Sequence, residues 1–295
     1  MGQMLLRSVD VLKGGEILAM PVLSNKSDIL IPKGVAIKTE YIPLIASLGI
    51  QDVMIEDTDD DHETSYTIIE KSHYDDYVKR IKRIMESHIY QSNGSLREFE
   101  MIADQIVKEI QLVEDEMTFI LKERQTNLYE HTIMVTLLCV LIGKRLHLDK
   151  DRLYSIAVGA LMHDIGIRYI TVSYENIDID SLEPAAIFEL KKHTILGYSA
   201  LEGESWIPAI SRKMILCHHE RKDGTGYPMR QKNKEIECGI IQVCDAFDGY
   251  ISGMECRRKS VQDTLALFRE CAGITYQKKV VDKLLKTIQA KNVNI

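Results

Sequence analysis

Three apolar segments in the second half of the chain each end in, or contain, side chains of the kind that bind metal ions. Buried imidazole and carboxylate groups cost free energy unless they are paired, and one bound cation would pair with several of them. The chain must therefore fold so that the segments bring these side chains to one place. The side chains are His163 and Asp164, His218 and His219, and Asp245.

The same half of the chain has helical hydrophobic periodicity almost throughout. The first 57 residues differ, because glycine and proline punctuate short apolar runs, as in strands joined by turns. A short helix at 39–48 and a strand at 52–55 are predicted there. We therefore expect a mostly α fold with a small strand-rich N-terminal module. The later helices are predicted at 129–146, 151–163, 183–196, 207–218, 237–252, 260–272 and 277–290.

Three parts are predicted along the chain. A strand-rich module occupies residues 1–64, a helical linker 65–119, and the helical domain with the histidines 120–295. An apolar stripe with helical spacing runs from Leu96 to Ile120. Such a stripe packs on its own domain or on a partner helix, so a homodimer through paired helices stays open.

Composition excludes several classes of protein. The formal net charge of -7 is opposite in sign to a DNA-binding face, although a local basic pocket for a phosphate ligand stays compatible with it. The longest nearly uninterrupted apolar run, 132–143, is shorter than the roughly 20 residues of a membrane span. The N-terminus lacks the pattern of a secretory signal. The six cysteines form no CxxC pair and fit reduced, buried thiols in a cytoplasmic protein.

Four histidines fall outside the group of metal-type ligands. His62, His73 and His88 stand in polar sequence and His147 stands at a predicted helix end, so all four are assigned to the surface. The acidic run 56–63 lacks the glycine and the spaced glutamate of a calcium loop. We expect it to be a solvated linker.

Five histidines and two aspartates remain as candidate metal ligands. Mixed imidazole and carboxylate ligands favour Fe, Mn or Zn over Mg or Ca. Because one ion needs fewer ligands than these, two ions are predicted. The candidates are His131, His163, Asp164, His193, His218, His219 and Asp245.

A tight loop follows the histidine pair and has the composition of a phosphate-handling segment. It reads RKDGTGYP at 221–228, with two glycines, an aspartate and a proline that favour a turn. Backbone N–H groups, two basic side chains and an aromatic ring therefore lie beside the histidines. A purely structural loop is the alternative, but this position favours a loop that faces a ligand.

Three motifs together resemble the HD-GYP family, a branch of the HD phosphohydrolases: HDIG at 163–166, HHERKDGTGYP at 218–228 and DAFDGY at 245–250. The resemblance covers roughly residues 120–290, and the first 57 residues are similar to a module often joined to such domains. It implies a helical HD-type bundle that hydrolyses cyclic di-GMP to linear pGpG, and onward to GMP, with two divalent metal ions. Protein partners at the GYP loop stay open.

The resemblance also implies roles for individual residues. His131, His163, Asp164 and Asp245 would hold one metal, and Asp164 would bridge to a second held by His193, His218 and His219. Some relatives bind a third iron through a glutamate four residues before the first histidine, where this chain has Asn127. Contacts with the substrate are implied for Arg221, Asp223, Gly226, Tyr227 and Arg257.

Two departures from the family pattern concern the substrate. The family reads HDIGK, but here Ile167 takes the lysine position, so Arg168 becomes the candidate catalytic cation beside Asp164. Met254 replaces one arginine of an R-P-Y-R-like string, whereas Arg257 is kept. We therefore expect a slow phosphodiesterase. The alternative is a receptor or interaction module that keeps the metal site and binds cyclic dinucleotide without turnover.

Overall fold

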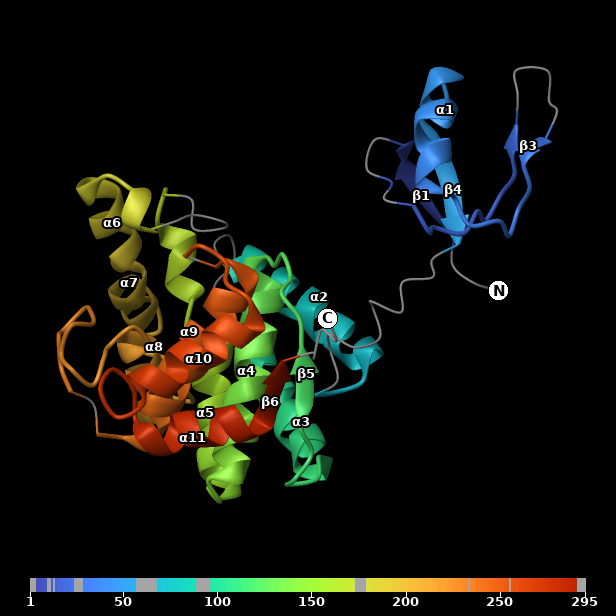
Figure 1. Cartoon of the computed structure of the whole chain (residues 1–295). Coiled ribbons are helices and arrows are strands. Elements are labelled where there is room, and N and C mark those ends of the chain that lie inside the picture. Colours follow the sequence, from blue (N-terminus) through green and yellow to red (C-terminus); the bar gives the residue numbers. More distant parts are fainter. Residues whose placement is uncertain are drawn as a thin grey trace. The chain divides into compact units, whose positions relative to one another are not determined.

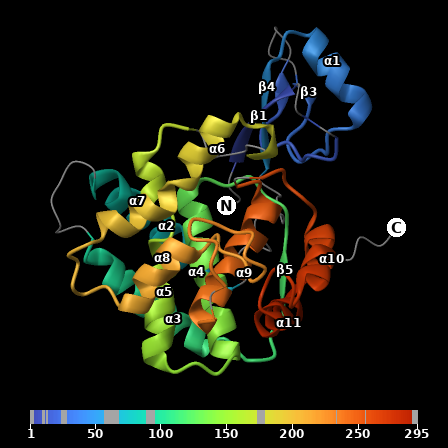
Figure 2. The same ribbon diagram turned by 90° about the vertical axis from the view of Figure 1, so that its left-hand side faces the viewer.

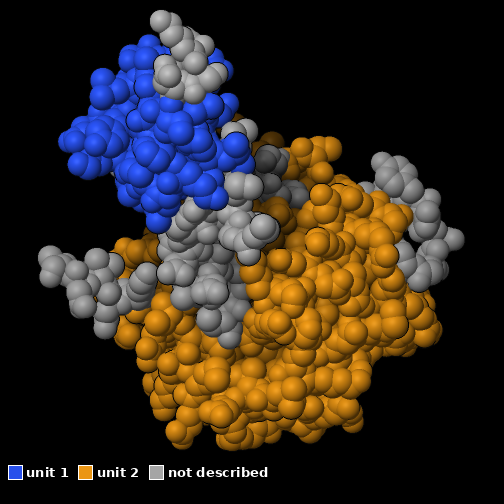
Figure 3. All heavy atoms as spheres, turned by 90° about the vertical axis from the view of Figure 1, so that its right-hand side faces the viewer, with its two compact units in different colours: residues 1–63 blue, residues 64–295 orange. Residues whose placement is uncertain are grey.

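The computed structural model describes residues 4–9, 12, 14–23, 29–56, 68–88, 96–172, 179–232, 234–254 and 256–290. The chain divides into two compact units, residues 1–63 and 64–295, which Figure 3 colours separately. Each unit has a hydrophobic core of its own. His62 and the acidic residues from 57 onward lie outside the described part of the chain.

The first unit is small and strand-rich, as predicted. Strands β1 (Met4–Ser8) and β4 (Asp52–Glu56) pair antiparallel, and so do β2 (Val22–Leu23) and β3 (Ile29–Ile31). The helix predicted at 39–48 is a short 3-10 turn followed by α1 (Ile42–Ser47). One apolar cluster joins these elements and includes Leu18, Ile37, Ile45, Val53 and Ile55.

The second unit is a bundle of helices, drawn in Figure 1. The mostly α fold is therefore confirmed. Among the helices that the structure describes, none is long and apolar enough to cross a membrane. The helices are α2 (Lys71–His88), α3 (Glu98–Leu112), α4 (Leu128–Arg145), α5 (Lys150–Leu161), α6 (Pro184–Lys191), α7 (His193–Ala200), α8 (Ala209–Cys217), α9 (Ile236–Ser252), α10 (Val261–Cys271) and α11 (Lys278–Thr287).

Helix α4 lies at the centre of this unit, packed between α5 and α9 (Figure 2). Every side chain from Thr132 to Gly143 is buried, so the longest apolar run of the sequence forms the core. Asn127 begins the helix, because its side-chain oxygen accepts the backbone N–H of Tyr129 and Glu130 at 3.0 and 3.1 Å. This cap places His131 in the first turns of α4.

The apolar stripe of residues 96–120 packs within the chain from Leu96 to Ile110, whereas Met117 and Ile120 are exposed. Phe99, Ile102, Ile106 and Ile110 of α3 are fully buried in the core that α4 and α5 share. Their burial explains the periodicity of this part of the stripe without a second subunit, and a homodimer through paired helices stays a prediction. The division of 64–295 into a linker and a domain stays a prediction.

The second unit differs from the predicted helices at two places. Residues 119–121 form strand β5 (Phe119–Leu121), which pairs in parallel with β6 (Ile288–Ala290) at the end of the predicted helix 277–290. Strands of three residues are too short for their period of two to show in the sequence. The helix predicted at 183–196 is divided into α6 and α7, which meet at Lys192.

Candidate metal centre and cavity

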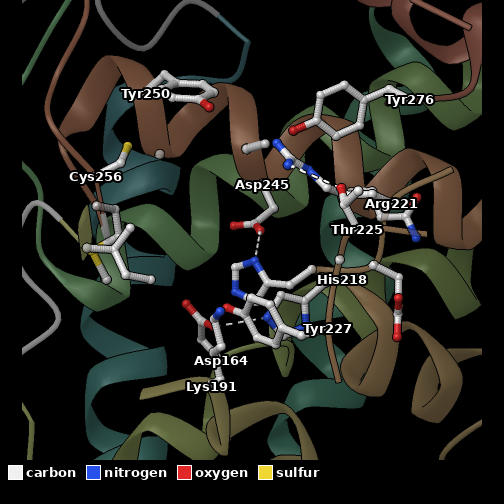
Figure 4. Close-up of a pocket in the computed structure, with 18 of the residues that line it drawn as sticks. Asp164, Lys191, His218, Arg221, Thr225, Tyr227, Asp245, Tyr250, Cys256 and Tyr276 are labelled. Carbon is white, nitrogen blue, oxygen red and sulfur yellow. Dashed lines mark hydrogen bonds and ion pairs between the residues drawn. The ribbon is translucent and has the colours of Figure 1, made fainter. Parts of the chain in front are cut away.

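The seven predicted metal ligands meet in one place in the second unit, and Figure 4 labels Asp164, His218 and Asp245 among them. All seven are buried except His219, whose side chain is 20% exposed. Five helices therefore contribute to a single cluster. His131 lies on α4, His163 and Asp164 follow α5, His193 opens α7, His218 and His219 follow α8, and Asp245 lies on α9.

Asp164 lies between two groups of imidazoles. Its Oδ1 is 3.6 Å from His193 Nε2 and 3.5 Å from His218 Nε2. Its Oδ2 is 3.3 Å from His163 Nε2 and 3.8 Å from His131 Nε2. One carboxylate oxygen thus faces each group, which is the arrangement that a bridging ligand needs.

The two groups are compact enough to hold one ion each. The candidate ligand atoms within each group lie within 4.8 Å of one another. Asp245 Oδ1 adds a carboxylate to one group, at 3.1 Å from His131 Nε2 and 3.7 Å from His163 Nε2. The groups are Asp164 with His193, His218 and His219, and Asp164 with His131 and His163.

Four of the imidazoles are held with Nε2 turned toward the cluster. His163, His193 and His218 each donate Nδ1–H to the carbonyl three residues earlier, at 2.7, 2.7 and 2.8 Å. His131 donates Nδ1–H to Asp248 Oδ2 at 2.7 Å. With the proton on Nδ1, a neutral ring keeps a lone pair on Nε2. Such outer hydrogen bonds are typical of histidines that ligate metals.

Two of the Nε2 atoms oppose each other. His193 Nε2 and His218 Nε2 are 3.0 Å apart. Burial lowers the pKa of His193 to about 4, so this ring is neutral near pH 7 and cannot donate from Nε2 while Nδ1 keeps its proton. A cation beside both nitrogens and Asp164 would bind their lone pairs. The side chains present therefore fit a divalent metal ion.

The two aspartates carry the negative charge that such ions require. Burial would raise the pKa of Asp164, but His163 and His218 beside it hold that pKa well below its ordinary value. Burial acts on Asp245 in the same direction, and His131 and His163 likewise hold the pKa of Asp245 well below its ordinary value. Both carboxylates are therefore ionised and ready to bind a cation.

Gly166 lets the turn that carries Asp164 pack against the start of α7. A Cβ at this position would lie 1.8 Å from the carbonyl oxygen of His193 and 2.5 Å from the nitrogen of Gly197. The 3-10 segment η3 (Ile165–Tyr169) therefore lies directly against the backbone of α7. This close approach brings Asp164 within reach of His193.

A cavity of about 280 Å³ opens beside the cluster (Figure 4). Of the predicted substrate residues, Arg221, Gly226 and Tyr227 line it. A Cβ on Gly226 would lie 2.4 Å from the carbonyl oxygen of His219, so glycine allows the loop to fold back on the ligands. The ring of Tyr227 then stacks on His219, with centroids 4.6 Å apart.

Three of the predicted catalytic and substrate residues are not among those that line the cavity. Asp223 Oδ1 accepts the backbone N–H and the hydroxyl of Thr225 at 2.9 and 2.6 Å, which closes a turn within the loop. Arg168 donates from Nη1 to the hydroxyl of Tyr129 on α4 at 3.0 Å. Arg257 is exposed. Contacts of these three with a substrate stay predictions.

Comparison with known proteins agrees with this geometry. The HD domain family model matches residues 128–250, which contain all seven candidate ligands. A cyclic di-GMP phosphodiesterase of Thermotoga maritima is 30% identical over 172 residues, covering 55% of this chain and 45% of that protein. The cyclic di-GMP phosphodiesterase response regulator RpfG of Xanthomonas campestris is 29% identical over 155 residues, covering 50% and 39%. The second unit carries an HD-GYP domain.

The fold of the chain is also similar to a solved structure with an HD-GYP domain. Bd1817, described as an HDG"Y"P protein from Bdellovibrio bacteriovorus, superposes with a TM-score of 0.57 at 14% identity, covering 96% of this chain and 98% of Bd1817. The chain spans less than half the length of the two curated relatives named above. The HD domain and the histidine–aspartate cluster together support a metal-dependent phosphohydrolase.

Two residues around the HD-GYP cluster were missed by the sequence reasoning. Asp248 is fully buried on α9 and joins His131 Nδ1, at 2.7 Å, to Arg124 Nη2, at 2.6 Å. A signal for Asp248 was present, since it lies three residues after Asp245 and so on the same face of the helix. Nothing local points to Arg124, which lies between β5 and α4.

Two of the histidines assigned to the surface lie outside the HD-GYP cluster, as expected. The imidazole of His73 is 53% exposed and its Nδ1 lies 3.3 Å from Glu109 Oε1. His147 is exposed and follows the end of α4. The side chain of His88 lies outside the described residues, like the whole of His62.

Proposed function

We propose that this HD-GYP chain is a phosphodiesterase that hydrolyses cyclic di-GMP to pGpG, and onward to GMP, with two divalent ions, Fe or Mn. The observation that carries the proposal is the position of Asp164, with one carboxylate oxygen facing each group of imidazoles. The substrate is supported by relatives named cyclic di-GMP phosphodiesterases.

The residues of this chain divide into two sets for the two ions. Asp164 serves both, with His131, His163 and Asp245 on one side and His193, His218 and His219 on the other. Such a pair of ions, when bound, activates a water molecule and stabilises negative charge on a phosphodiester. Asn127 uses its side chain to cap α4, which favours two ions over three.

The reaction consumes one water molecule for each phosphodiester. The water oxygen bonds to phosphorus, the bond from phosphorus to the 3′-oxygen breaks, and a proton goes to that oxygen. The linear product keeps the phosphate on its 5′ end. In the cavity wall, Arg221 offers a cation to phosphate, and Tyr227, Tyr250 and Tyr276 offer aromatic rings to the bases.

Two features favour slow turnover. If turnover is lost altogether, the chain would act as a receptor that binds the dinucleotide without hydrolysing it. Ile167, at the family's lysine position, is 2% exposed and belongs to the core. Met254 lines the cavity with a thioether where the family pattern has an arginine. Removing one electrostatic contact with a reacting phosphate commonly costs about a hundredfold in rate. A chain that binds cyclic di-GMP without turnover is therefore the second candidate.

Product analysis tests the proposal. Protein loaded with Mn²⁺ or Fe²⁺ is incubated with cyclic di-GMP, and the nucleotides are separated by chromatography, with the Asp164→Asn variant as the matched control. We expect pGpG with the wild type and none with the variant. Binding without product supports the receptor, and a wild type that neither binds nor cleaves cyclic di-GMP contradicts both candidates.

A further inference from the structure

Neither Ile167, at the family's lysine position, nor the next residue, Arg168, offers a cation to the cavity. Ile167 is buried in the core, so a lysine in its place would be buried too. Arg168 is engaged with the hydroxyl of Tyr129, 3.0 Å from its Nη1. A dinucleotide with two phosphodiesters still needs cationic partners besides the metals. Other basic side chains that line the cavity are the candidates for this role.

Lys191 is such a basic side chain, and it was not among the site residues predicted from the sequence. It is the last residue of α6, two positions before His193, and it lines the cavity. Among the residues that the structure describes, no carboxylate lies within ion-pair distance of its ammonium group. Its neighbour Lys192 differs, because its Nζ pairs with Glu189 at 2.7 Å and it does not line the cavity.

The position of the Lys191 ammonium group is tied to the metal cluster through Tyr227. Its Nζ lies 5.2 Å from the centroid of the Tyr227 ring. That ring stacks on His219 and also meets His193 edge to face, with centroids 6.3 Å apart. An aromatic face holds an ammonium group in place without neutralising its charge.

The cations of the cavity approach from two elements. Lys191 comes from the end of α6, and Arg221 from the loop that follows His219. In the view of Figure 4, Lys191 is labelled below His218 and Arg221 above it. A phosphate beside the cluster can therefore meet positive charge from two separate elements.

We propose that Lys191 binds a non-bridging oxygen of the phosphate in the cavity, in place of the lysine that the HDIG turn lacks. The inference rests on the proposed function for the identity of the nucleotide. The chemistry of the contact, an ammonium group with a phosphate oxygen, is the same for inorganic phosphate. Both ligands therefore serve as probes.

The test compares Lys191→Gln, Lys191→Arg and the control Lys192→Gln, each loaded with Mn²⁺. Lys191→Gln should lower kcat/KM for cyclic di-GMP about a hundredfold. It should also weaken binding of inorganic phosphate and of a hydrolysis-resistant phosphorothioate analogue about tenfold, with metal content unchanged. Lys191→Arg should recover part of each loss because it keeps the charge, and Lys192→Gln should match the wild type.

The two binding arms separate this inference from the proposed function. If the wild type cleaves cyclic di-GMP and Lys191→Gln equals it in turnover and in both binding assays, Lys191 does not contact the phosphate. If the wild type neither cleaves cyclic di-GMP nor binds its phosphorothioate analogue, while Lys191→Gln still weakens the binding of inorganic phosphate, the inference stands and the proposed substrate is wrong. If the wild type is inactive and all variants bind inorganic phosphate equally well, both the role of Lys191 and the proposed function are overturned.

Discussion

At the scale of single residues, Asp248 shows how a side chain outside the ligand set prepares a ligand. Its carboxylate is fully buried, accepts Nδ1–H of His131 and is paired with Arg124. Burial would lower the pKa of His131, but Asp245 and Asp248 beside it raise that pKa to about 9. The same contact fixes the ring so that Nε2 faces Asp245.

Asp248→Asn should weaken the ion on the His131 side. The amide keeps the shape of the side chain but loses the charge that holds Nδ1–H, and such outer partners are typically worth 10- to 100-fold in metal affinity. Titration with Mn²⁺ should show one of two sites weakened by about that factor. Two unaltered sites would mean that Asp248 is only a structural partner of Arg124.

Asp164→Ala should lose more metal than any single histidine variant. Its two oxygens face different imidazole groups, so its removal affects both sites, whereas His131→Ala and His193→Ala each affect one. Elemental analysis of the purified proteins measures the ratio of metal to chain. His147→Ala is the control, because this exposed residue lies outside the cluster, and full metal in Asp164→Ala would exclude bridging.

At the scale of elements, contacts between backbones position the ligands. η3 and α7 approach so closely that Gly166 and Gly197 face each other. Gly166 has no room for a Cβ, and a Cβ on Gly197 would lie 3.1 Å from the backbone nitrogen of Gly166. His163 and His218 follow the ends of α5 and α8, and each donates Nδ1–H to a carbonyl of the last helical turn. The ends of the helices and the directions of the imidazoles are thus set together.

Gly166→Ala should destabilise the second unit and reduce its metal content. The new methyl would meet the carbonyl oxygen of His193, which belongs to a backbone and cannot rotate away, so we expect a cost of about 3 kcal/mol. Urea unfolding and elemental analysis measure the two effects. Gly143→Ala is the matched control, since its methyl would meet only the tips of Leu153, Ile156 and Leu148. Equal losses in the two variants would contradict the argument.

At the scale of the whole molecule, the two units have separate cores, and the seven candidate ligands all belong to the second. Ions bound at this cluster would join five helices and would stabilise only the folded state of that unit. Chelation should therefore act on one unit and leave the other unchanged.

Removal of metal by EDTA should lower the Tm of the second unit alone. Binding at 100 times Kd contributes about 2.7 kcal/mol per site, so the shift should reverse on adding Mn²⁺ and should grow with its concentration. Thermal unfolding followed by the fluorescence of Trp206 reports on the second unit, which contains the only Trp of the sequence. A Tm that is independent of Mn²⁺ would show that no ion is bound.

The sequence by itself determined the helical class, the order of most helices and the residues that form the cluster. Apolar periodicity is a local property of the sequence. His163 and His218 end apolar segments and Asp245 lies within one, so all three can be recognised from the sequence. The strands β5 and β6 could not be predicted, because each is three residues long and the pairing joins residues far apart in the chain.

Only the tertiary structure decided which cations and which outer partners reach the site. His131 meets Asp248 across 117 positions of sequence, so no spacing rule connects them. The chain turns Arg168 toward Tyr129 and leaves Lys191 at the cavity, although both stand close in sequence to a candidate ligand. The direction of a side chain at the end of a helix depends on what packs against that end, and this is settled by contacts between distant segments.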